Sequence, residues 1–217
     1  LLGYILNKTF REENLNVFDV KFIEKPKSGS IPEWRGYLLE FKVISEEKFS
    51  EFNGDLDSIR RNAIKLNNQS PKYEVEISAY EYVEGATTRE LDGVILRVYT
   101  LEMILFEKIR ALCQTMPEYS EIVKSARPKH RARDIYDIFI IFNSGTLNLD
   151  KDMLIEIFKA KQVPLEFINH MENLREHNRE NWETVRSSIS ESDRNNLQDY
   201  DYYFDQIIKI IEPFKTL

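Results

Sequence analysis

Residues 99–142 read YTLEMILFEKIRALCQTMPEYSEIVKSARPKHRARDIYDIFIIF, which predicts two helices joined by a basic loop because apolar residues recur with helical spacing toward each end. Lys108 interrupts the apolar run MILFEKIRAL of the first helix, and Asp134 and Asp137 open the second helix. A charged side chain in an apolar pattern is costly to bury unless it is paired or used in chemistry. A helical hairpin can bring this lysine and these two aspartates together, so the stretch predicts a candidate phosphate and metal site.

These charged residues also have simpler explanations. Lys108 could lay its stem over the core and place its amine in water, and the residue pattern alone favours this explanation. Asp134 suits the first turn of a helix because of the helix macrodipole, and Arg133 could pair with a nearby carboxylate. Asp134 and Asp137 are three residues apart and share one helix face, so they could instead bind Mg²⁺, which takes oxygen ligands.

The composition describes a folded and acidic chain. Of its 217 residues, 42% are hydrophobic and 12% are aromatic, which supports a core and argues against wholesale disorder. The net charge of −7 excludes nucleic-acid binding through overall charge, so an RNA partner would need a local basic patch. The segment Lys124 to Arg133, KSARPKHRAR, is such a patch, and Lys129 and Arg131 within it are the predicted RNA contacts.

Cysteine content and hydropathy limit the kinds of site and the location. Cys113 is the only cysteine, so an internal disulfide and a cysteine-rich zinc site are excluded. No catalytic partner stands near it in the sequence, and we interpret it as a buried or half-buried thiol rather than a nucleophile. No apolar run approaches the roughly 18 residues of a membrane span. The sequence therefore predicts a cytoplasmic protein without a membrane partner.

Strands come first along the chain and helices come afterwards. Alternating or apolar runs predict strands at residues 17–24, 37–44, 73–79 and 93–98. Helical patterns follow at residues 100–113, 132–143, 150–160, 164–178, 179–188 and 199–212. This order predicts an α+β domain at residues 1–145 and a C-terminal helical domain at residues 146–217, divided at the turn-rich stretch NSGTLNLD.

Two glutamates on the third predicted strand form a further candidate. Glu74 and Glu76 point to one side of the strand YEVEISA, while Val75 and Ile77 point to the other. Glutamates on a solvated strand face are common and need no special role. The alternative is that Glu76 binds a metal or acts as a general base.

The order of these segments resembles the AbiEii/AbiGii toxin family of nucleotidyltransferases. The resemblance rests on YTLEMILFEKIRAL with Lys108 and on RARDIYDI with Arg133, Asp134 and Asp137. The segments YLLEFKVI, RRNAIKL and YEVEIS also fit upstream, and VPLEFI and REHNRENW fit the helical tail of a subgroup. The resemblance implies a polymerase-β-like nucleotidyltransferase sheet with helices, followed by a C-terminal helical bundle.

The resemblance also implies a reaction. A protein of this family would transfer NMP from NTP, with Mg²⁺, to an RNA acceptor such as tRNA or to a protein acceptor, as the toxin of a toxin–antitoxin or abortive-infection system. Lys108 matches the lysine that handles the triphosphate, and Asp134 matches the acidic residue of the closing motif. Glu76 falls where a further carboxylate can join the metal. Arg133 would contact phosphate, and Asp137 would orient the site.

The chain departs from the family pattern toward its front. The family's Gly-Gly-Ser/Thr turn and its Asp-x-Asp strand should precede YLLEFKVI, and Leu1 begins too late to include them. Gly29-Ser30 and Asp55-x-Asp57 are not replacements, because the aspartates lie in the polar run NGDLDS, which we interpret as a turn and a helix cap. We therefore expect a truncated chain that is inactive by itself. The alternative is a non-catalytic interaction module that binds a cognate antitoxin or another protein.

Overall fold

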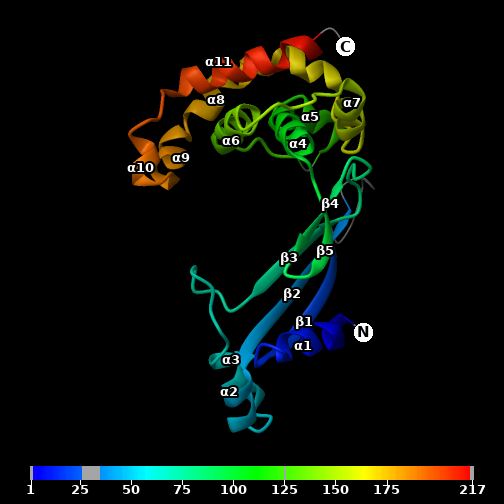
Figure 1. Ribbon diagram of the computed structural model, residues 1–217, viewed down its shortest axis with the longest axis vertical. Coiled ribbons are helices and arrows are strands. Elements are labelled where there is room, and N and C mark those ends of the chain that lie inside the picture. Colours follow the sequence, from blue (N-terminus) through cyan, green and yellow to red (C-terminus); the bar gives the residue numbers. More distant parts are fainter. Residues whose placement is uncertain (1, 26–34, 125, 216–217) are drawn as a thin grey trace. The chain divides into compact units, whose positions relative to one another are not determined.

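The computed structural model describes residues 2–25, 35–124 and 126–215 and divides the chain into two compact units (Figure 1). The first unit ends at Tyr80, and the second begins at Glu81. The mixture of antiparallel strands and helices confirms the predicted α+β class. The domain boundary predicted between residues 145 and 146 lies within the second unit. Gly29 and Ser30 lie outside the described residues.

The first unit is built on an antiparallel sheet of order β1-β2-β3. Its elements are α1 (Leu2–Arg11), β1 (Leu15–Lys25), β2 (Gly36–Ser45), α2 (Glu46–Glu51), α3 (Leu56–Arg61) and β3 (Tyr73–Ser78). Val17 of β1 lies opposite Val43 of β2, and both are buried with Leu39 and Phe41. Phe10 of α1 packs edge-on against Phe41, with ring centroids 5.7 Å apart. The apolar side of α1 therefore covers one face of the sheet.

A bulge in β1 is held by an ion-paired aspartate. The register of β1 against β2 shifts between Phe18 and Lys21, and Asp19 has a φ of 50°. The Asp19 carboxylate accepts two hydrogen bonds of 2.9 Å from Arg60 of α3 and one of 2.9 Å from Lys42 of β2. The hydrogen bonds from Arg60 contribute most to lowering the pKa of Asp19 to about 2. This carboxylate thus joins the bulge to the neighbouring strand and to α3.

The second unit begins with a β-hairpin and continues as a set of helices. Its elements are β4 (Thr87–Leu91), β5 (Val94–Val98), α4 (Leu101–Cys113), α5 (Tyr119–Ile122), α6 (Ala132–Asn143), α7 (Lys151–Lys159), the 3₁₀ helix η2 (Leu165–Leu174), α8 (Arg175–Arg179), α9 (Trp182–Ser188), α10 (Glu191–Arg194), α11 (Tyr200–Ile211) and the 3₁₀ turn η3 (Glu212–Phe214). Asp92 and Gly93 have φ values of 50° and 78°, as a tight hairpin turn requires. None of the helices in the described part of the chain is long and apolar enough to cross a membrane.

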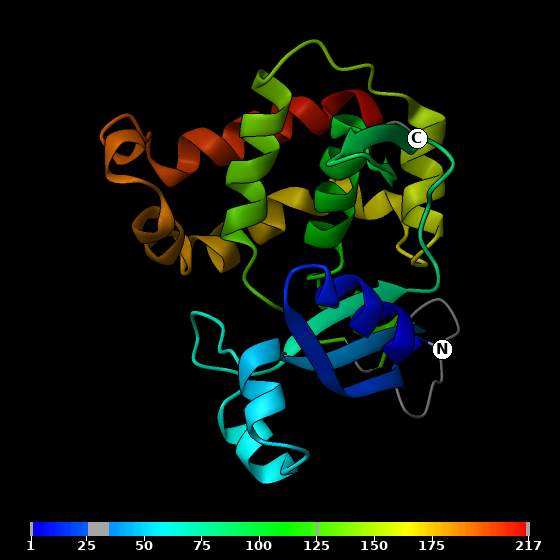
Figure 2. The same ribbon diagram turned by 60° about the horizontal axis from the view of Figure 1, so that its bottom comes forward.

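Helix α4 is the centre of the second unit. It packs against α6 on one side and α7 on the other, as Figure 2 shows. Its side chains Met103, Leu105, Phe106, Ile109 and Leu112 are fully buried. The helix begins at Thr100, whose hydroxyl accepts a hydrogen bond of 3.3 Å from the Met103 amide. A lysine in this helix must therefore either reach solvent or find anionic partners.

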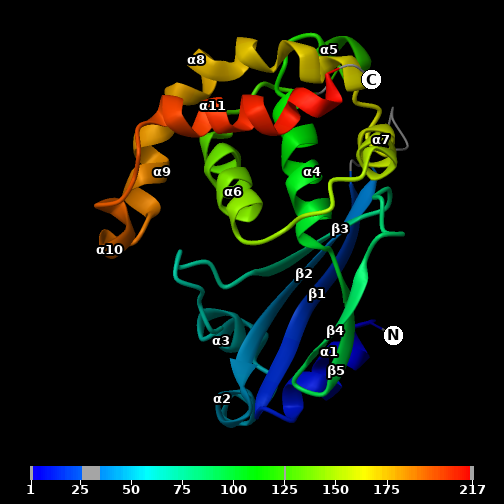
Figure 3. The same ribbon diagram turned by 45° about the horizontal axis from the view of Figure 1, so that its top comes forward.

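Helix α11 joins the C-terminal part of the chain to α6. It lies across α6 in Figure 3, and the two helices are in contact. Aromatic rings form the contact, with Tyr203 lying 5.4 Å from Tyr136 and 5.0 Å from Phe139, centroid to centroid. The aromatic residues near the start of α11 therefore serve as packing between the two helices.

Candidate active site

Lys108 of α4 is held between two aspartates of α6. Its Nζ atom lies 2.8 Å from Asp134 Oδ1 and 2.9 Å from Asp137 Oδ2. The exposed fractions of the three side chains are 23%, 16% and 25%, so the cluster is half-buried. The structure thus brings together the three residues that the helical hairpin predicts to meet. The snorkelling alternative for Lys108 is wrong, because its ammonium ends in an ion-pair cluster.

Two arginines occupy the remaining carboxylate oxygens. Arg131 Nη1 lies 2.8 Å from Asp134 Oδ2, and Arg133 Nε lies 2.8 Å from Asp137 Oδ1. The five side chains form an alternating row in the order Arg131, Asp134, Lys108, Asp137 and Arg133. Three cations face two anions, so the row carries an excess of one positive charge. An anion such as phosphate would be attracted to it.

The row follows from helix geometry and from position along α6. Asp134 and Asp137 are three residues apart and therefore share the face that α6 turns toward α4. Burial alone would lower the pKa of Lys108, but the hydrogen bonds that its ammonium donates to Asp134 and Asp137 outweigh this effect and raise it. The amine is therefore firmly protonated. An ammonium has three N–H donors, so the two aspartates leave one donor for a further anion.

The row does not fit a magnesium site. Each of the four oxygens of Asp134 and Asp137 accepts a hydrogen bond from a cationic side chain, so a metal ion bound to them would lie beside three positive charges that repel it. The described residues contain no group of three or more His, Cys, Asp or Glu side chains that could hold a metal ion. The suggestion that these two aspartates bind Mg²⁺ is therefore not supported by the arrangement of their partners.

Glu76 lies on β3 in the first unit, whereas the ion-pair row belongs to the second. It pairs in register with Leu38 of β2, and its side chain is exposed. The neighbouring Glu74 is exposed as well. This is the solvated strand face that the sequence offers as the simpler explanation, and the metal-binding role of Glu76 stays a prediction.

The basic loop before α6 is exposed over most of its length, but its residues differ in their partners. Residues 127–130 are exposed, and Lys129 is among them. Arg127 donates to the backbone carbonyls of Lys124 and Ala126 at 3.1 and 2.9 Å. Arg131, in contrast, pairs with Asp134. Its predicted role as an RNA contact therefore competes with a place in the ion-pair row, which the sequence did not reveal.

A second ion-paired group lies on another side of α4. Glu107 pairs with the buried Arg110, and Lys161 Nζ lies 2.9 Å from Glu81. Burial raises the pKa of Glu107 although Arg110 opposes the shift. Cys113, one turn further along the helix, is fully buried, and burial raises the pKa of its thiol far above the ordinary value. A thiol in that state is a poor nucleophile, in agreement with the sequence interpretation.

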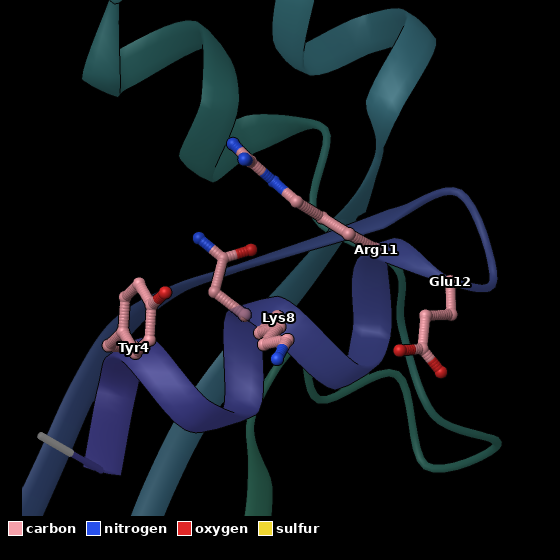
Figure 4. A pocket seen from close by; sticks show the side chains of 5 residues that line it. Tyr4, Lys8, Arg11 and Glu12 are labelled. Carbon is pink, nitrogen blue, oxygen red and sulfur yellow. The ribbon is translucent and has the colours of Figure 1, made fainter.

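A cavity of about 440 Å³ lies beside α1 in the first unit (Figure 4). Its lining consists of Tyr4, Asn7, Lys8, Arg11 and Glu12. Asn7 Oδ1 accepts a hydrogen bond of 3.3 Å from the Val17 amide, and Arg11 Nε donates one of 3.3 Å to Asn16 Oδ1. These two side chains attach α1 to the start of β1. None of the predicted site residues lines this cavity.

One comparison with known proteins identifies a family. The sequence model for the family described as nucleotidyl transferase AbiEii toxin, Type IV TA system, matches residues 6–209. No curated protein and no solved structure matches the chain. The family match spans the sheet, the helix that carries Lys108 and the helix that carries Asp134 and Asp137. The chain therefore belongs to the AbiEii family of nucleotidyl transferase toxins.

Proposed function

We propose that this chain is the nucleotide-handling part of a toxin that transfers NMP from NTP to an RNA acceptor such as tRNA. The observation that carries the proposal is the row around Lys108, found in a chain whose family match covers residues 6–209. The substrates suggest action in the cytoplasm, where NTPs and tRNA are found.

Lys108 would hold the triphosphate. Its ammonium keeps one N–H donor beyond those used by Asp134 and Asp137, and it stays protonated because these carboxylates raise its pKa. In nucleotidyl transfer, negative charge develops on the leaving pyrophosphate. A preorganised cation placed beside that charge lowers the barrier. The two aspartates are positioning residues in this scheme, since they orient the lysine and do not touch the nucleotide.

Arg133 is the second group that could reach phosphate. More than half of the Arg133 side chain is exposed. Asp137 accepts a hydrogen bond from its Nε–H, and one Nη1–H donates to Ser188 at 3.2 Å. A guanidinium has five N–H donors in a planar fork, which suits bidentate contact with phosphate oxygens. Lys108 and Arg133 flank Asp137, so a single polyphosphate could contact both cations.

Magnesium is part of the proposal, because phosphoryl transfer of this kind is assisted by metal ions. Glu76 is the described carboxylate that we assign to the metal. The described residues do not make a metal site by themselves, so no step of the reaction is assigned to the ion here.

The acceptor RNA would bind along the basic loop. Lys129 is exposed, and within the described part of the chain the hydrogen-bond partners of Arg127 are backbone carbonyls, so both side chains can contact a phosphate backbone. The loop leads directly into the first turn of α6, which carries Asp134. RNA on this loop would thus lie close to the proposed triphosphate position.

The direct test is transfer of label from α-phosphate-labelled NTPs to total RNA by the natural protein that contains this chain. We expect labelling that is lost in Lys108→Ala and kept in Lys209→Ala, an exposed lysine of α11. Labelling that survives Lys108→Ala would contradict the assigned role. Complete absence of labelling with every NTP and RNA tested would contradict the transferase itself.

A second candidate function is antitoxin binding without catalysis. The β4–β5 hairpin favours it, because Leu91, Val94 and Ile95 have exposed fractions of 61%, 56% and 75%. Capture of the cognate antitoxin by purified protein tests this candidate. It predicts that Ile95→Lys abolishes capture while Lys108→Ala leaves it intact; equal capture by both variants would exclude the hairpin.

A further inference from the structure

Asn178 of α8 is a fully buried polar side chain with two hydrogen-bond partners. Its Oδ1 accepts a hydrogen bond of 2.6 Å from the backbone amide of Arg131, and its Nδ2 donates one of 3.0 Å to the Leu174 carbonyl. A buried amide side chain must be paired to be tolerated, and this one is paired at both ends. The residue lies in the segment REHNRENW, which the reaction described above does not use.

The backbone amide that donates to Asn178 is the N-cap amide of α6. Arg131 is the N-cap residue, and its side chain makes no capping hydrogen bond. Asp134 stands three positions later, where an acidic or amide side chain ordinarily reaches back to the N-cap amide. Here both Asp134 oxygens are used, one by Lys108 and one by the Arg131 guanidinium. Asn178 satisfies the amide in place of Asp134.

Neighbouring contacts strengthen the attachment of α6 to α8 and α9. The His130 Nδ1 atom lies 2.6 Å from the His177 carbonyl oxygen, and the rings of these histidines stack with centroids 4.4 Å apart. Arg133 Nη1 donates to Ser188 Oγ at 3.2 Å. The first turn of α6 is therefore fixed from outside the helix at three points, at residues 130, 131 and 133.

We propose that Asn178 is a positioning residue. Its side chain accepts the hydrogen bond of the N-cap amide of α6, so the Asp134 carboxylate remains available to bind Lys108. The proposal deepens the function assigned to the Lys108 site and rests on it for its effect on nucleotide binding. Its structural part, the link from Asn178 through Asp134 to Lys108, can be tested without any nucleotide.

Replacing Asn178 by alanine would leave the Arg131 amide without this acceptor in a partly buried place. An amide without a partner is unfavourable where water is partly excluded, so it would compete for the carboxylate of Asp134, which stands three positions after the N-cap residue. Asp134 would then turn toward the amide, and Lys108 would keep Asp137 alone. The ammonium would become more mobile, more readily deprotonated and less able to hold a triphosphate.

The first readout is the rate at which acetic anhydride acetylates Lys108 at mildly alkaline pH, followed by peptide mass spectrometry. We expect Asn178→Ala to raise this rate by about fivefold to tenfold, since a change of one unit in pKa alters the free-amine fraction about tenfold. Asp134→Asn should raise the rate as well, and adding Asn178→Ala to it should raise the rate no further. A further rise in the double variant would show that Asn178 does not act through Asp134.

Two variants separate positioning from mere stability. Asn178→Asp keeps an acceptor for the Arg131 amide but buries a charge, so it should destabilise the fold while leaving the Lys108 rate near that of the unmodified protein. Leu174→Ala removes a buried side chain next to Asn178 and keeps the Leu174 carbonyl, so it should also lower stability without changing the rate. Rates that follow the loss of stability across all three variants would overturn the proposal.

The second readout is the Kd for ATP. Asn178→Ala should weaken ATP binding by about fivefold to tenfold, the size expected from losing one helix-cap hydrogen bond, and Asn178→Asp should weaken it less. Unmodified protein that fails to bind ATP would contradict the proposed function, and the acetylation rates would still decide the link to Lys108. ATP binding that Asn178→Ala leaves unchanged, in a protein that binds ATP, would contradict the positioning role.

Discussion

Lys108 and Asp134, which are 26 residues apart in the sequence, meet at 2.8 Å where α4 packs against α6. Each would be an unfavourable charge at a helix–helix contact if it were alone. Together with Asp137 and two arginines they form a row in which every carboxylate oxygen has a cationic donor. The excess positive charge of this row makes it a place for an anion, and the lysine is its most central cation.

The row should stabilise the second unit. Asp134→Asn removes the charge that faces both Lys108 and Arg131, and we expect it to lower the free energy of unfolding by about 1–3 kcal/mol, because Arg131 then loses its carboxylate partner and Lys108 keeps Asp137 alone. Urea unfolding at pH 7 measures the change. Glu183→Gln is the matched control, since the Glu183 side chain is 81% exposed and its pairing with Arg186 should matter little. Equal effects of the two substitutions would mean that the row does not stabilise the fold.

RNA binding should depend on the exposed part of the basic loop. We expect charge reversal at Arg127 or Lys129 to weaken RNA binding and to reduce the slope of log K against log salt by about 1 for each lost phosphate contact. Filter binding of tRNA across a salt series measures both effects. Lys209→Glu gives the same change in net charge on α11 and should leave the slope unaltered. A slope that Arg127→Glu and Lys129→Glu both leave unchanged would rule the loop out.

Arg131 is a poor choice for that experiment, although the sequence suggests it. Its guanidinium pairs with Asp134, so Arg131→Glu would place two carboxylates together in the row. We expect this variant to unfold at lower urea concentration than Lys129→Glu, by about 1–2 kcal/mol in free energy. Unfolding curves of the two variants decide the point. Identical stability would indicate that the Arg131–Asp134 pair contributes nothing in solution.

Asp19 should make the first unit sensitive to acid. Hydrogen bonds from Arg60 and Lys42 lower its pKa from 3.8 to about 2, so the folded state favours the charged carboxylate. The resulting stability is present above pH 4 and is lost as the pH falls toward 2, and it amounts to about 2 kcal/mol. Asp19→Asn, which tolerates the positive φ, should therefore be less stable than the unmodified protein at pH 6 and nearly equal to it at pH 2.

Urea unfolding at these two pH values tests the expectation for Asp19. Arg60→Gln should reproduce part of the effect, because Arg60 supplies two of the three hydrogen bonds. A difference between Asp19→Asn and the unmodified protein that is the same at both pH values would show that the carboxylate gains nothing from its charge.

The C-terminal end of the chain should unfold together with α4. Phe214 is buried and packs edge-on against Phe106 of α4, with centroids 5.6 Å apart. We expect Phe214→Ala to lower the free energy of unfolding by about 3–5 kcal/mol, as for other large core truncations. In a variant in which Trp34, the other tryptophan of the chain, is replaced by phenylalanine, the fluorescence of Trp182 and the far-ultraviolet signal should report one common transition. Separate transitions for the two probes would mean that the C-terminal helices form an independent domain.

The sequence predicts the Lys108 site because charge in an apolar helix is a local signal. Lys108, Asp134 and Asp137 differ from their neighbours in residue type and spacing. The helical hairpin brings the three side chains into contact. The interpretation of NGDLDS as a turn and a helix cap succeeds for the same reason: the capping residue is Asp55, whose carboxylate accepts a hydrogen bond of 3.1 Å from the Asp57 amide at the start of α3. Both predictions depend on residues close together in one or two elements.

The features that the sequence does not reveal depend on distant partners. Strand β4 reads TTREL, which lacks apolar alternation because nearly all of the strand is exposed. In the sequence, Asn178 resembles any other polar residue of the helical tail. Its role becomes visible in the fold, where its side chain contacts Arg131, which is 47 residues away in the sequence. The sequence predicts an RNA contact at Arg131 because it gives the charge of this side chain but does not show that Asp134 is its partner.

Recognition of a nucleotide triphosphate by Lys108 can be measured by comparing the binding of ATP with that of AMP. Isothermal titration calorimetry with unmodified protein, Lys108→Met and the control Lys209→Met would give a Kd for each nucleotide. We predict that the unmodified protein and Lys209→Met bind ATP at least about tenfold more tightly than AMP, a difference of about 1.4 kcal/mol, and that Lys108→Met loses this preference. An equal preference for ATP in Lys108→Met and in the unmodified protein would contradict the account.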